Sequence, residues 1–499
     1  MNRIEKIIEF FGRQKMIVYL GLAILLFFLT LFKLNAVGIH NWDESLFANR
    51  ALHWAAHGEY FTNWETLEFC KMDHPNTKPP LVSLIQAGMY KLFSYERWAL
   101  RLPIVLFGLA CALGWVRVFK KDLSMPLIGW TSVFILLINK AINERHLMGW
   151  SGDHDIPLAF FLFASLIFYW RYWNFEQNKG RNLLLFFAFT GMAVLTKSIT
   201  GLFFLPGVFL YTIFFRPWLS LLKDKFFYIG LCLFLVLLSS FYGLMELKEE
   251  GFLQLVWDNE IGGRYNKSID DHLQPFDFYG KYLIKYFMPW LCFVPVGIWY
   301  GWRSDNVALK SITRLTTFCA VCLFFVLSAA ETKLYWYLAS LYPLLSMLSA
   351  LGVVFIIKAL VERVSFLKGT KVINGLIVAI FLSPFIIKAI DRKSSISNIE
   401  PTEKIELALD KFRKEIPEYT KIRIHSRNVY YPTLVYLANK YQHVYGYEIE
   451  LVTSYDELFK GDVIVGEYHA CMSNLELEKH GEYKGIKMYE VVSVRPKEE

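Results

Sequence analysis

Two adjacent carboxylates follow the first long apolar stretch of the chain. They are Asp43 and Glu44, in the segment "HNWDESLFANR" that spans residues 40–50. A carboxylate can orient a substrate hydroxyl group and accept its proton. Asn41 stands three residues before Glu44, in the spacing of a capping box, so a helix is expected to begin here and run to about His57. The pair therefore has two interpretations: it complements a helix dipole, or it acts on a substrate.

Four cations have positions that suit a phosphate group. Lys78 precedes the Pro79–Pro80 pair, which restricts the backbone and can start a second amphipathic helix. Such a lysine can bind phosphate, or it can extend its stem along the membrane interface. Lys197 and Lys333 stand at the ends of apolar blocks, where a lysine can also serve only as an anchor. Arg264 completes the set, with a salt bridge in its acidic loop as the alternative role.

Further polar and aromatic residues extend this candidate site. The segment "GDHD" contains Asp153, His154 and Asp155, which together could bind a divalent cation. Three ligands without a fixed geometry do not establish a metal, so no cofactor is assigned, and His154 is expected to be a partner or a cap. Trp42 and Trp257 could stack on a sugar, although an aromatic belt at the membrane interface is the simpler explanation for most such residues.

The elements that must position these residues are long apolar blocks. Of the 499 residues, 55% are hydrophobic and 17% aromatic, too many for a soluble globular chain of this size. Because several blocks approach the roughly 20 residues that cross a bilayer, we expect a polytopic α-helical membrane protein with about eleven transmembrane helices. The expected spans are residues 16–39, 98–118, 125–142, 155–173, 183–196, 199–215, 226–245, 281–302, 315–330, 334–357 and 372–390.

Two of these spans need comment. The first is too long, and lacks the small-residue cleavage site, to be a removed signal peptide, so we expect it to remain as a helix. The span at 183–196 is the shortest, and a re-entrant segment is its alternative interpretation.

The charges between the blocks indicate an orientation. With the N-terminus in the cytoplasm, every inner segment is basic, whereas residues 246–281 contain eight Asp or Glu against four Lys or Arg. The net charge of +8 is thus distributed as orientation signals, not as a surface for nucleic acid. Two long outer loops follow from this topology, at about 40–97 and 246–280, and the tail also lies outside.

The C-terminal tail has a different composition. Residues 392–499 are more polar, with strand-like segments "KIRIHS", "GDVIVGE" and "IKMYEVV" and the helix-like segment "EKIELALDKFRKEI". We therefore expect a transmembrane catalytic domain at 1–391 and a small extracytoplasmic α/β domain at 392–499. Cys70 and Cys471 would both face the outside, and the sequence leaves open whether they pair.

At this point the motifs resemble a known family. The segments "WDESLFANRALHWAAHGEYFTNW", "TKPPL", "RWALRLP", "GWSGDHDIPLAFFLFAS", "GMAVLTKSITGLFFLP", "VWDNEIGGRY" and "ETKLYWYLASLYPLLSMLSALG" recur in order between residues 41 and 352. This order resembles the polyprenyl-phosphate-sugar-dependent glycosyltransferases of the GT-C fold. They include the protein O-mannosyltransferases and the lipid A aminoarabinose transferases.

The resemblance implies roles for individual residues. Asp43 matches the acid that activates or orients the acceptor, with Glu44 completing the acidic pair, and Asp155 matches a second acid at the outer end of a span. Lys78 matches the lysine that contacts the donor phosphate, and Lys197 matches the lysine of an "LTKG" motif in which Ser198 here replaces the glycine.

The same resemblance extends to a later segment, and it has departures. Arg264 and Tyr265 stand where the aminoarabinose transferases have an Arg-Phe pair. Leu46 and Phe47 replace an Arg-Tyr pair, and Ile261 replaces the histidine of a Glu-His pair, so the resemblance does not specify aminoarabinose as the sugar.

The resemblance implies a membrane enzyme. It would transfer a hexose or pentose, with inversion, from a polyprenyl phosphate, in a bacterium undecaprenyl phosphate, to lipid A, another envelope glycan or a protein. The site would lie on the outer face of the inner membrane, without nucleic acid as a partner. Two alternatives are a transporter or flippase of a lipid-linked sugar, which would predict charges deep within the spans and related halves, and a non-catalytic envelope scaffold.

Overall fold

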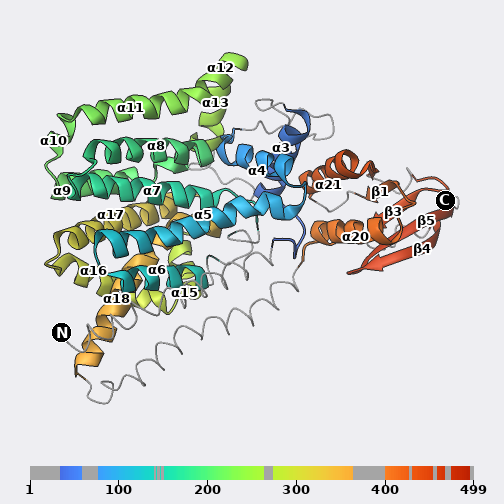
Figure 1. Ribbon diagram of the computed structural model, residues 1–499. Coiled ribbons are helices and arrows are strands. Elements are labelled where there is room, and N and C mark those ends of the chain that lie inside the picture. Colours follow the sequence, from blue (N-terminus) through green and yellow to red (C-terminus); the bar gives the residue numbers. More distant parts are fainter. Residues whose placement is uncertain are drawn as a thin grey trace.

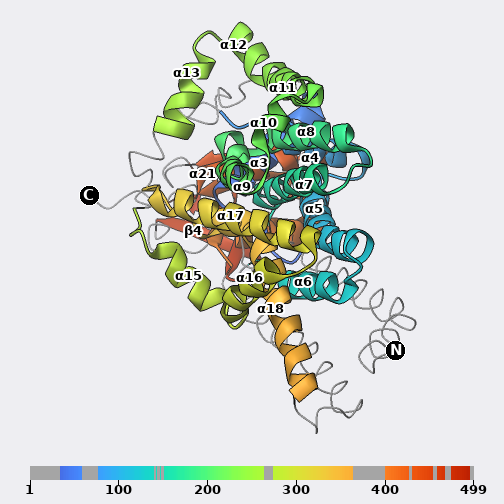
Figure 2. The ribbon, with the colours of Figure 1, turned by 90° about the vertical axis from the view of Figure 1, so that its left-hand side faces the viewer.

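The computed structural model describes residues 34–58, 77–139, 142, 147, 151–262, 273–363, 399–425, 430–452, 458–466 and 474–494. Most of these residues are helical, and the long helices run side by side in one bundle (Figure 1), which Figure 2 shows from the end away from the β-sheet. A smaller unit with a β-sheet lies at the end of the bundle where α3 and α4 are found (Figure 1). The structure therefore confirms the expectation of a mainly helical protein.

Six helical segments among the described residues are long and apolar enough to cross a membrane. They are α5 (Arg97–Arg117) with η2 (Val118–Asp122), α7 (Asp155–Asn174), α8 (Lys179–Lys197) with η4 (Ser198–Leu202), α11 (Lys225–Leu238) with η5 (Ser239–Gly243) and α12 (Leu244–Lys248), α17 (Val307–Ala329), and α18 (Tyr342–Arg363). A seventh candidate is a pair bent by 109°, α15 (Phe278–Tyr286) with η7 (Trp290–Cys292) and α16 (Phe293–Arg303).

The expected number of eleven spans is therefore supported only in part. Most of the expected span 16–39, and all of 372–390, lie outside the described residues. The expected spans 125–142 and 199–215 coincide with short apolar helices, α6 (Pro126–Ile138) and α9 (Leu205–Phe215). The block at 183–196 is instead part of the 24-residue segment formed by α8 and η4. Other short helices are α10 (Trp218–Leu222) and α13 (Phe252–Val256).

Close helix contacts in the bundle depend on small residues. A Cβ atom on Gly297 of α16 would lie 1.8 Å from the Leu348 carbonyl oxygen, and one on Gly352 of α18 would lie 2.2 Å from the Phe293 carbonyl oxygen. The two backbones therefore touch, as small residues allow in membrane helices. In η4, which follows α8, a Cβ on Gly201 would lie 2.3 Å from the Val194 nitrogen of α8. This close approach folds η4 back onto α8.

Helices α3 (Asp43–His57) and α4 (Leu81–Leu92) cover the end of the bundle (Figure 1). Both were expected from the sequence, but the capping box was wrong. The residue before α3 is Trp42, and Asn41 Oδ1 instead accepts hydrogen bonds from Thr402 and Thr433 at 2.8 and 2.9 Å. A tertiary contact has replaced the local cap.

The C-terminal unit is a mixed five-stranded sheet with two helices. Its strand order is β2-β1-β3-β5-β4, in which β2, β1 and β3 are parallel and β3, β5 and β4 antiparallel. The elements are α20 (Pro401–Glu415), β1 (Lys421–His425), α21 (Tyr431–Tyr445), β2 (Glu448–Val452), β3 (Val463–Gly466), β4 (Leu475–Tyr483) and β5 (Ile486–Val494). The expected boundary between residues 391 and 392 falls outside the described residues.

The C-terminal unit shares a hydrophobic core with α3, α4 and the start of α5. Ala51 and Trp54 of α3 belong to the same buried cluster as Ile405 of α20, Leu434 of α21 and Met488 of β5. Apolar burial of this kind is the main favourable contribution to holding two parts of a chain together. The unit is therefore fixed against the end of the bundle.

Candidate active site

One lysine stands between two carboxylates, at the meeting point of three helices. Lys197 ends α8, Asp155 begins α7 and Asp43 begins α3. Lys197 Nζ lies 2.6 Å from Asp155 Oδ2 and 3.6 Å from Asp43 Oδ2. The helix dipoles favour this arrangement, since acids are stabilised at N-termini and cations at C-termini. The Asp43 side chain is 27% exposed and that of Asp155 only 3%, so Asp43 is the more accessible carboxylate.

A second lysine approaches from the segment before α4. Lys78 Nζ lies 2.6 Å from Glu260 Oε1, and the Thr77 hydroxyl donates to the same oxygen at 3.0 Å. Glu260 belongs to η6 (Trp257–Gly262), a short π-helix. Buried Arg50 of α3 donates from Nη1 to the Lys78 carbonyl oxygen at 3.0 Å, which fixes the lysine backbone against α3.

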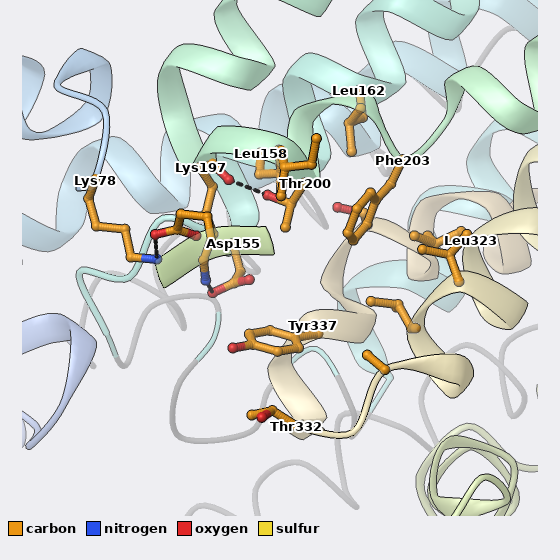
Figure 3. A pocket seen from close by; sticks show the side chains of 16 residues that line it. Lys78, Asp155, Leu158, Leu162, Lys197, Thr200, Phe203, Leu323, Thr332 and Tyr337 are labelled. Carbon is orange, nitrogen blue, oxygen red and sulfur yellow. Dashed lines mark hydrogen bonds and ion pairs between the residues drawn. The ribbon is translucent and has the colours of Figure 1, made fainter. Parts of the chain in front are cut away.

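Lys78, Asp155, Lys197 and Glu260 line one cavity (Figure 3). The space between its lining residues, together with the open solvent that it adjoins, amounts to about 740 Å³. Figure 3 shows Lys78, Lys197 and Asp155 together, with Leu162, Phe203 and Leu323 farther along the wall. The apolar lining comes from α7, from the residue after η4 and from α17, and includes Leu158, Leu162, Phe203, Leu323, Val326 and Leu327. The cavity thus combines a charged end with an apolar wall.

Glu44 lies in different surroundings from its neighbour Asp43. Its carboxylate is fully buried and accepts from Arg101 Nε and Nη2 at 2.7 and 2.9 Å. The N–H groups of His40 and Gly152 donate to it at 2.8 and 2.6 Å. Both carboxylate oxygens are therefore occupied by protein donors. This geometry assigns Glu44 to positioning of the site, whereas the sequence analysis grouped it with the catalytic acids.

Two residues of the segment considered as a weak metal site, His154 and Asp155, contact other side chains of the protein. The His154 ring stacks on Phe47 with centroids 3.5 Å apart, and its Nε2 lies 3.1 Å from Gln86 Oε1. Burial, followed by the charges of Arg50 and Lys197, lowers the pKa of His154 well below its usual value. Asp155 is engaged by Lys197. Within the described ranges, no group of three or more His, Cys, Asp or Glu side chains could hold a metal ion.

The remaining predicted residues lie at the margin of the site or outside the described part of the chain. Lys333 is buried, donates to the carbonyl oxygens of Gln274, at 2.8 Å, and Ala330, and is not among the described residues that line the cavity. Burial lowers its pKa. Trp257 is 56% exposed at the start of η6, and Trp42 is 41% exposed. Arg264, Tyr265, Cys70 and Cys471 lie outside the described residues.

Three residues were not singled out by the sequence analysis. Glu260 pairs with Lys78 across 182 positions of the chain. The Tyr337 ring lies 5.3 Å from Lys197 Nζ and also lines the cavity. Arg101 holds Glu44. All three lie in motifs quoted above, Glu260 in "VWDNEIGGRY", Arg101 in "RWALRLP" and Tyr337 in "ETKLYWYLASLYPLLSMLSALG", but no spacing within those motifs indicated which side chain would reach the site.

Comparison with known proteins places this geometry in context. The family model described as dolichyl-phosphate-mannose-protein mannosyltransferase matches residues 77–242, which contain Lys78, Asp155 and Lys197. No curated protein sequence matches the chain.

Two crystal structures of ArnT from Cupriavidus metallidurans are similar at 16% identity. The structure bound to undecaprenyl phosphate has a TM-score of 0.64 over 95% of this chain and 97% of that chain. The apo structure has a TM-score of 0.65 over 96% and 98%. The archaeal oligosaccharyltransferase AglB from Archaeoglobus fulgidus, in complex with an inhibitory peptide and a dolichol-phosphate, has a TM-score of 0.50 and 14% identity over 88% of this chain and 64% of that chain.

The match to ArnT covers nearly the whole of both chains, so the similarity includes the C-terminal unit as well as the helical bundle. The family model independently covers the segment with three of the four charged residues that line the cavity. The predicted resemblance is thus confirmed: the chain has the GT-C fold of the membrane glycosyltransferase superfamily that contains the protein mannosyltransferases and the lipid A aminoarabinose transferases.

Proposed function

We propose that this protein transfers a monosaccharide, with inversion, from a polyprenyl phosphate to an acceptor at the outer face of the membrane. One observation carries the proposal: the cavity joins a charged end, with Lys78 and Lys197, to an apolar wall. A lipid phosphate needs both surfaces. The presence of undecaprenyl phosphate in the ArnT structure and of a dolichol-phosphate in the AglB structure supports this class of donor.

The proposed chemistry assigns one task to each charged residue. Asp43 accepts the proton of the acceptor hydroxyl group. The hydroxyl oxygen attacks the anomeric carbon of the sugar from the side opposite the phosphate. The bond from that carbon to the phosphate oxygen breaks, and the polyprenyl phosphate leaves with the electron pair. Lys78 stabilises the negative charge on the departing phosphate. Lys197 holds Asp43 and Asp155 in place through the contacts at 3.6 and 2.6 Å.

The donor is proposed to displace an internal ion pair. Glu260 Oε1 forms an ion pair with Lys78 Nζ at 2.6 Å, and both side chains line the cavity. A phosphate that enters the charged end would take the place of the Glu260 carboxylate on Lys78. Leu46, Phe47 and Ile261 differ from the residues of the aminoarabinose transferases at these positions. The experiment must therefore also identify whether the sugar is a hexose or a pentose.

We also propose where the reaction takes place. Asp43, Lys78, Asp155 and Lys197 lie at the end of the bundle that carries α3, α4 and the C-terminal unit (Figure 1). The basic inner segments of the sequence favour a cytoplasmic N-terminus and put this end on the opposite side. In a bacterium this would be the outer face of the inner membrane. The acceptor would then be lipid A, another envelope glycan or a protein.

The test is sugar transfer by the purified protein in lipid vesicles with defined polyprenyl-phosphate sugars. Asp43→Asn is expected to lower kcat about 10²- to 10⁴-fold because the base is lost. Lys78→Ala is expected to lower kcat/KM for the donor about a hundredfold. Matched controls are Asp277→Asn and Lys281→Ala, which break an exposed ion pair of 2.6 Å and should leave transfer unchanged.

Two results would contradict this assignment. Full activity of Asp43→Asn with every acceptor would remove Asp43 as the base. Movement of labelled lipid-linked sugar across the vesicle membrane without a glycosidic product would indicate a transporter.

A further inference from the structure

The segment that leads to Asp43 is attached to the C-terminal unit. Ile39 and His40 make the first of these contacts. The Ile39 N–H donates to Glu406 Oε2 at 2.7 Å. The His40 imidazole is paired with the buried carboxylate of Glu403. Gly38 lies so close that a Cβ atom there would be 2.6 Å from the Glu403 Cα. The chain before α3 is therefore held by α20.

The next two residues continue these contacts. Asn41 Oδ1 accepts hydrogen bonds from the hydroxyl groups of Thr402 in α20 and Thr433 in α21. The Trp42 ring lies 5.0 Å from the Tyr430 ring, at an angle of 38°. Four consecutive residues thus contact the C-terminal unit, and Asp43 follows them directly. The unit forms a wall beside the proposed base.

Trp42 and Tyr430 of the C-terminal unit are accessible, and Trp42 has an unusual backbone conformation. Trp42 is 41% exposed, and Tyr430 is half-buried. Trp42 has a φ of 68°, which is rare for a bulky residue. Such a backbone persists where surrounding contacts fix it, and residues of this kind cluster at functional sites. The hydrogen bonds of Asn41 on one side and the start of α3 on the other supply that constraint.

Asp43 lies between the Trp42–Tyr430 pair and the cavity that is proposed to hold the donor. Lys197 and Asp155 line the cavity, whereas Asp43 and Trp42 are not among the described residues that do. Asp43 nevertheless contacts Lys197 at 3.6 Å and is 27% exposed. It therefore stands at the edge of the cavity, next to the aromatic pair.

We propose that Trp42 and Tyr430 bind the sugar ring of a glycan or glycolipid acceptor, so that the C-terminal unit forms the acceptor side of the site. The inference rests on the proposed function, which requires an acceptor hydroxyl at Asp43. The C–H face of a pyranose is apolar and packs on an aromatic ring, which leaves its hydroxyl groups free to reach a carboxylate. Peptides are often bound through main-chain hydrogen bonds, which ring faces do not provide.

The test uses saturation-transfer difference NMR with the full chain in lipid nanodiscs. The probe is a β-1,6-linked glucosamine disaccharide, and a threonine-containing pentapeptide is measured in parallel. The disaccharide C–H protons are expected to receive saturation from the protein. Tyr430→Ala is expected to weaken binding about threefold to tenfold, whereas Tyr430→Phe keeps the ring and the binding. Tyr483→Ala, at the end of β4, is the matched control.

Trp42→Leu tests the other ring, should Tyr430→Ala fail to fold. The inference is overturned if the disaccharide receives no saturation, if neither ring substitution changes its binding, or if the pentapeptide shows the dependence on Tyr430 instead. Transfer by the wild-type protein is measured separately in vesicles. Transfer that persists while the NMR prediction fails removes only the acceptor assignment, and absence of transfer from every donor removes the proposed function itself.

Discussion

Asp43 and Glu44 are neighbours in the sequence, yet their carboxylates have opposite surroundings. Glu44 is fully buried and accepts four hydrogen bonds, two of them from Arg101. Its bond to the Gly152 N–H connects α3 to the segment that leads into α7. The carboxylate thus connects the first turn of α3, which contains Asp43, to the residues just before Asp155 at the start of α7. A buried acid paired in this way is costly to disturb and has no oxygen left for a substrate.

Glu260 offers a direct prediction at this scale. Its carboxylate occupies Lys78 and would repel an incoming phosphate, so Glu260→Gln is expected to bind a polyprenyl phosphate about threefold to tenfold more tightly. Binding is measured by displacement of a fluorescent lipid phosphate in nanodiscs. Asp258→Asn is the matched control, because Asp258 belongs to the same short helix but accepts from Gln254. Weaker binding by Glu260→Gln would mean that Glu260 assists the donor.

Four residues that the sequence suggested for one site lie close together in the structure. Asp43, Lys78, Asp155 and Lys197 were expected on one side of the membrane, and the structure brings them to one end of the bundle. Asp43 and Asp155 contact Lys197, and Lys78 lines the same cavity as Asp155 and Lys197. The pairing of Lys78 with Glu260 could not be predicted from the sequence. It joins residues 182 positions apart, and only the folded bundle sets that distance.

At the scale of elements, the length of the helices was harder to predict than their existence. Apolar composition identifies a block, but it does not reveal where a helix bends or stops. The expected span at 281–302 is a pair of helices bent by 109°. The expected span at 199–215 is divided between η4 and α9, since η4 packs back on α8 at Gly201. These breaks depend on contacts with other helices, which hydropathy does not report.

The contact between α16 and α18 gives a prediction about packing. Gly297→Ala is expected to destabilise the protein by about 1–3 kcal/mol, because the added Cβ would lie 1.8 Å from the Leu348 carbonyl oxygen and force the helices apart. Thermal unfolding in detergent, followed by size-exclusion chromatography, measures the loss. Gly280→Ala in α15 is the control, since its Cβ would come no closer than 4.0 Å to a neighbouring atom. Equal stability of both variants would show that the helices do not touch here.

At the scale of the whole molecule, a buried charge cluster holds the C-terminal unit to the bundle. Glu406 of α20 lies 2.9 Å from Arg97 Nη1 and 3.3 Å from Lys440 Nζ. Composition and strand-like segments predicted this α/β unit, and β1, β3 and β5 match the segments named. They could not predict its attachment to the bundle, because the partners of Glu406 there, Arg97 of α5 and the Ile39 N–H, lie far from it in the sequence.

The cluster predicts how stability depends on pH. Burial alone would raise the pKa of Glu406, but the charges of Arg97 and Lys440 and the Ile39 N–H lower it from 4.5 to about 2. A depressed pKa stabilises the folded state above the unfolded value, and this stabilisation is lost as pH falls from 4.5 towards about 2. Thermal unfolding of the wild type should therefore shift downward in this window.

The matched variants separate Glu406 from other acids. Glu406→Gln is expected to be less stable at neutral pH and to lose part of the pH dependence in that window. Glu415→Gln changes an exposed acid in the same helix, 3.6 Å from Lys411, and should behave like the wild type. Identical pH profiles of Glu406→Gln and the wild type would show that the cluster does not hold the unit.

The charged residues of the site stand at helix ends, and the apolar wall of the cavity continues from them between helices. For the proposed reaction, this geometry means that the lipid donor arrives, and the lipid product departs, by lateral diffusion within the bilayer. Their effective concentrations are then mole fractions in the membrane plane. Dilution of the vesicles in buffer should leave the rate per protein unchanged for a membrane-bound acceptor, whereas dilution of the donor with other lipids should lower it.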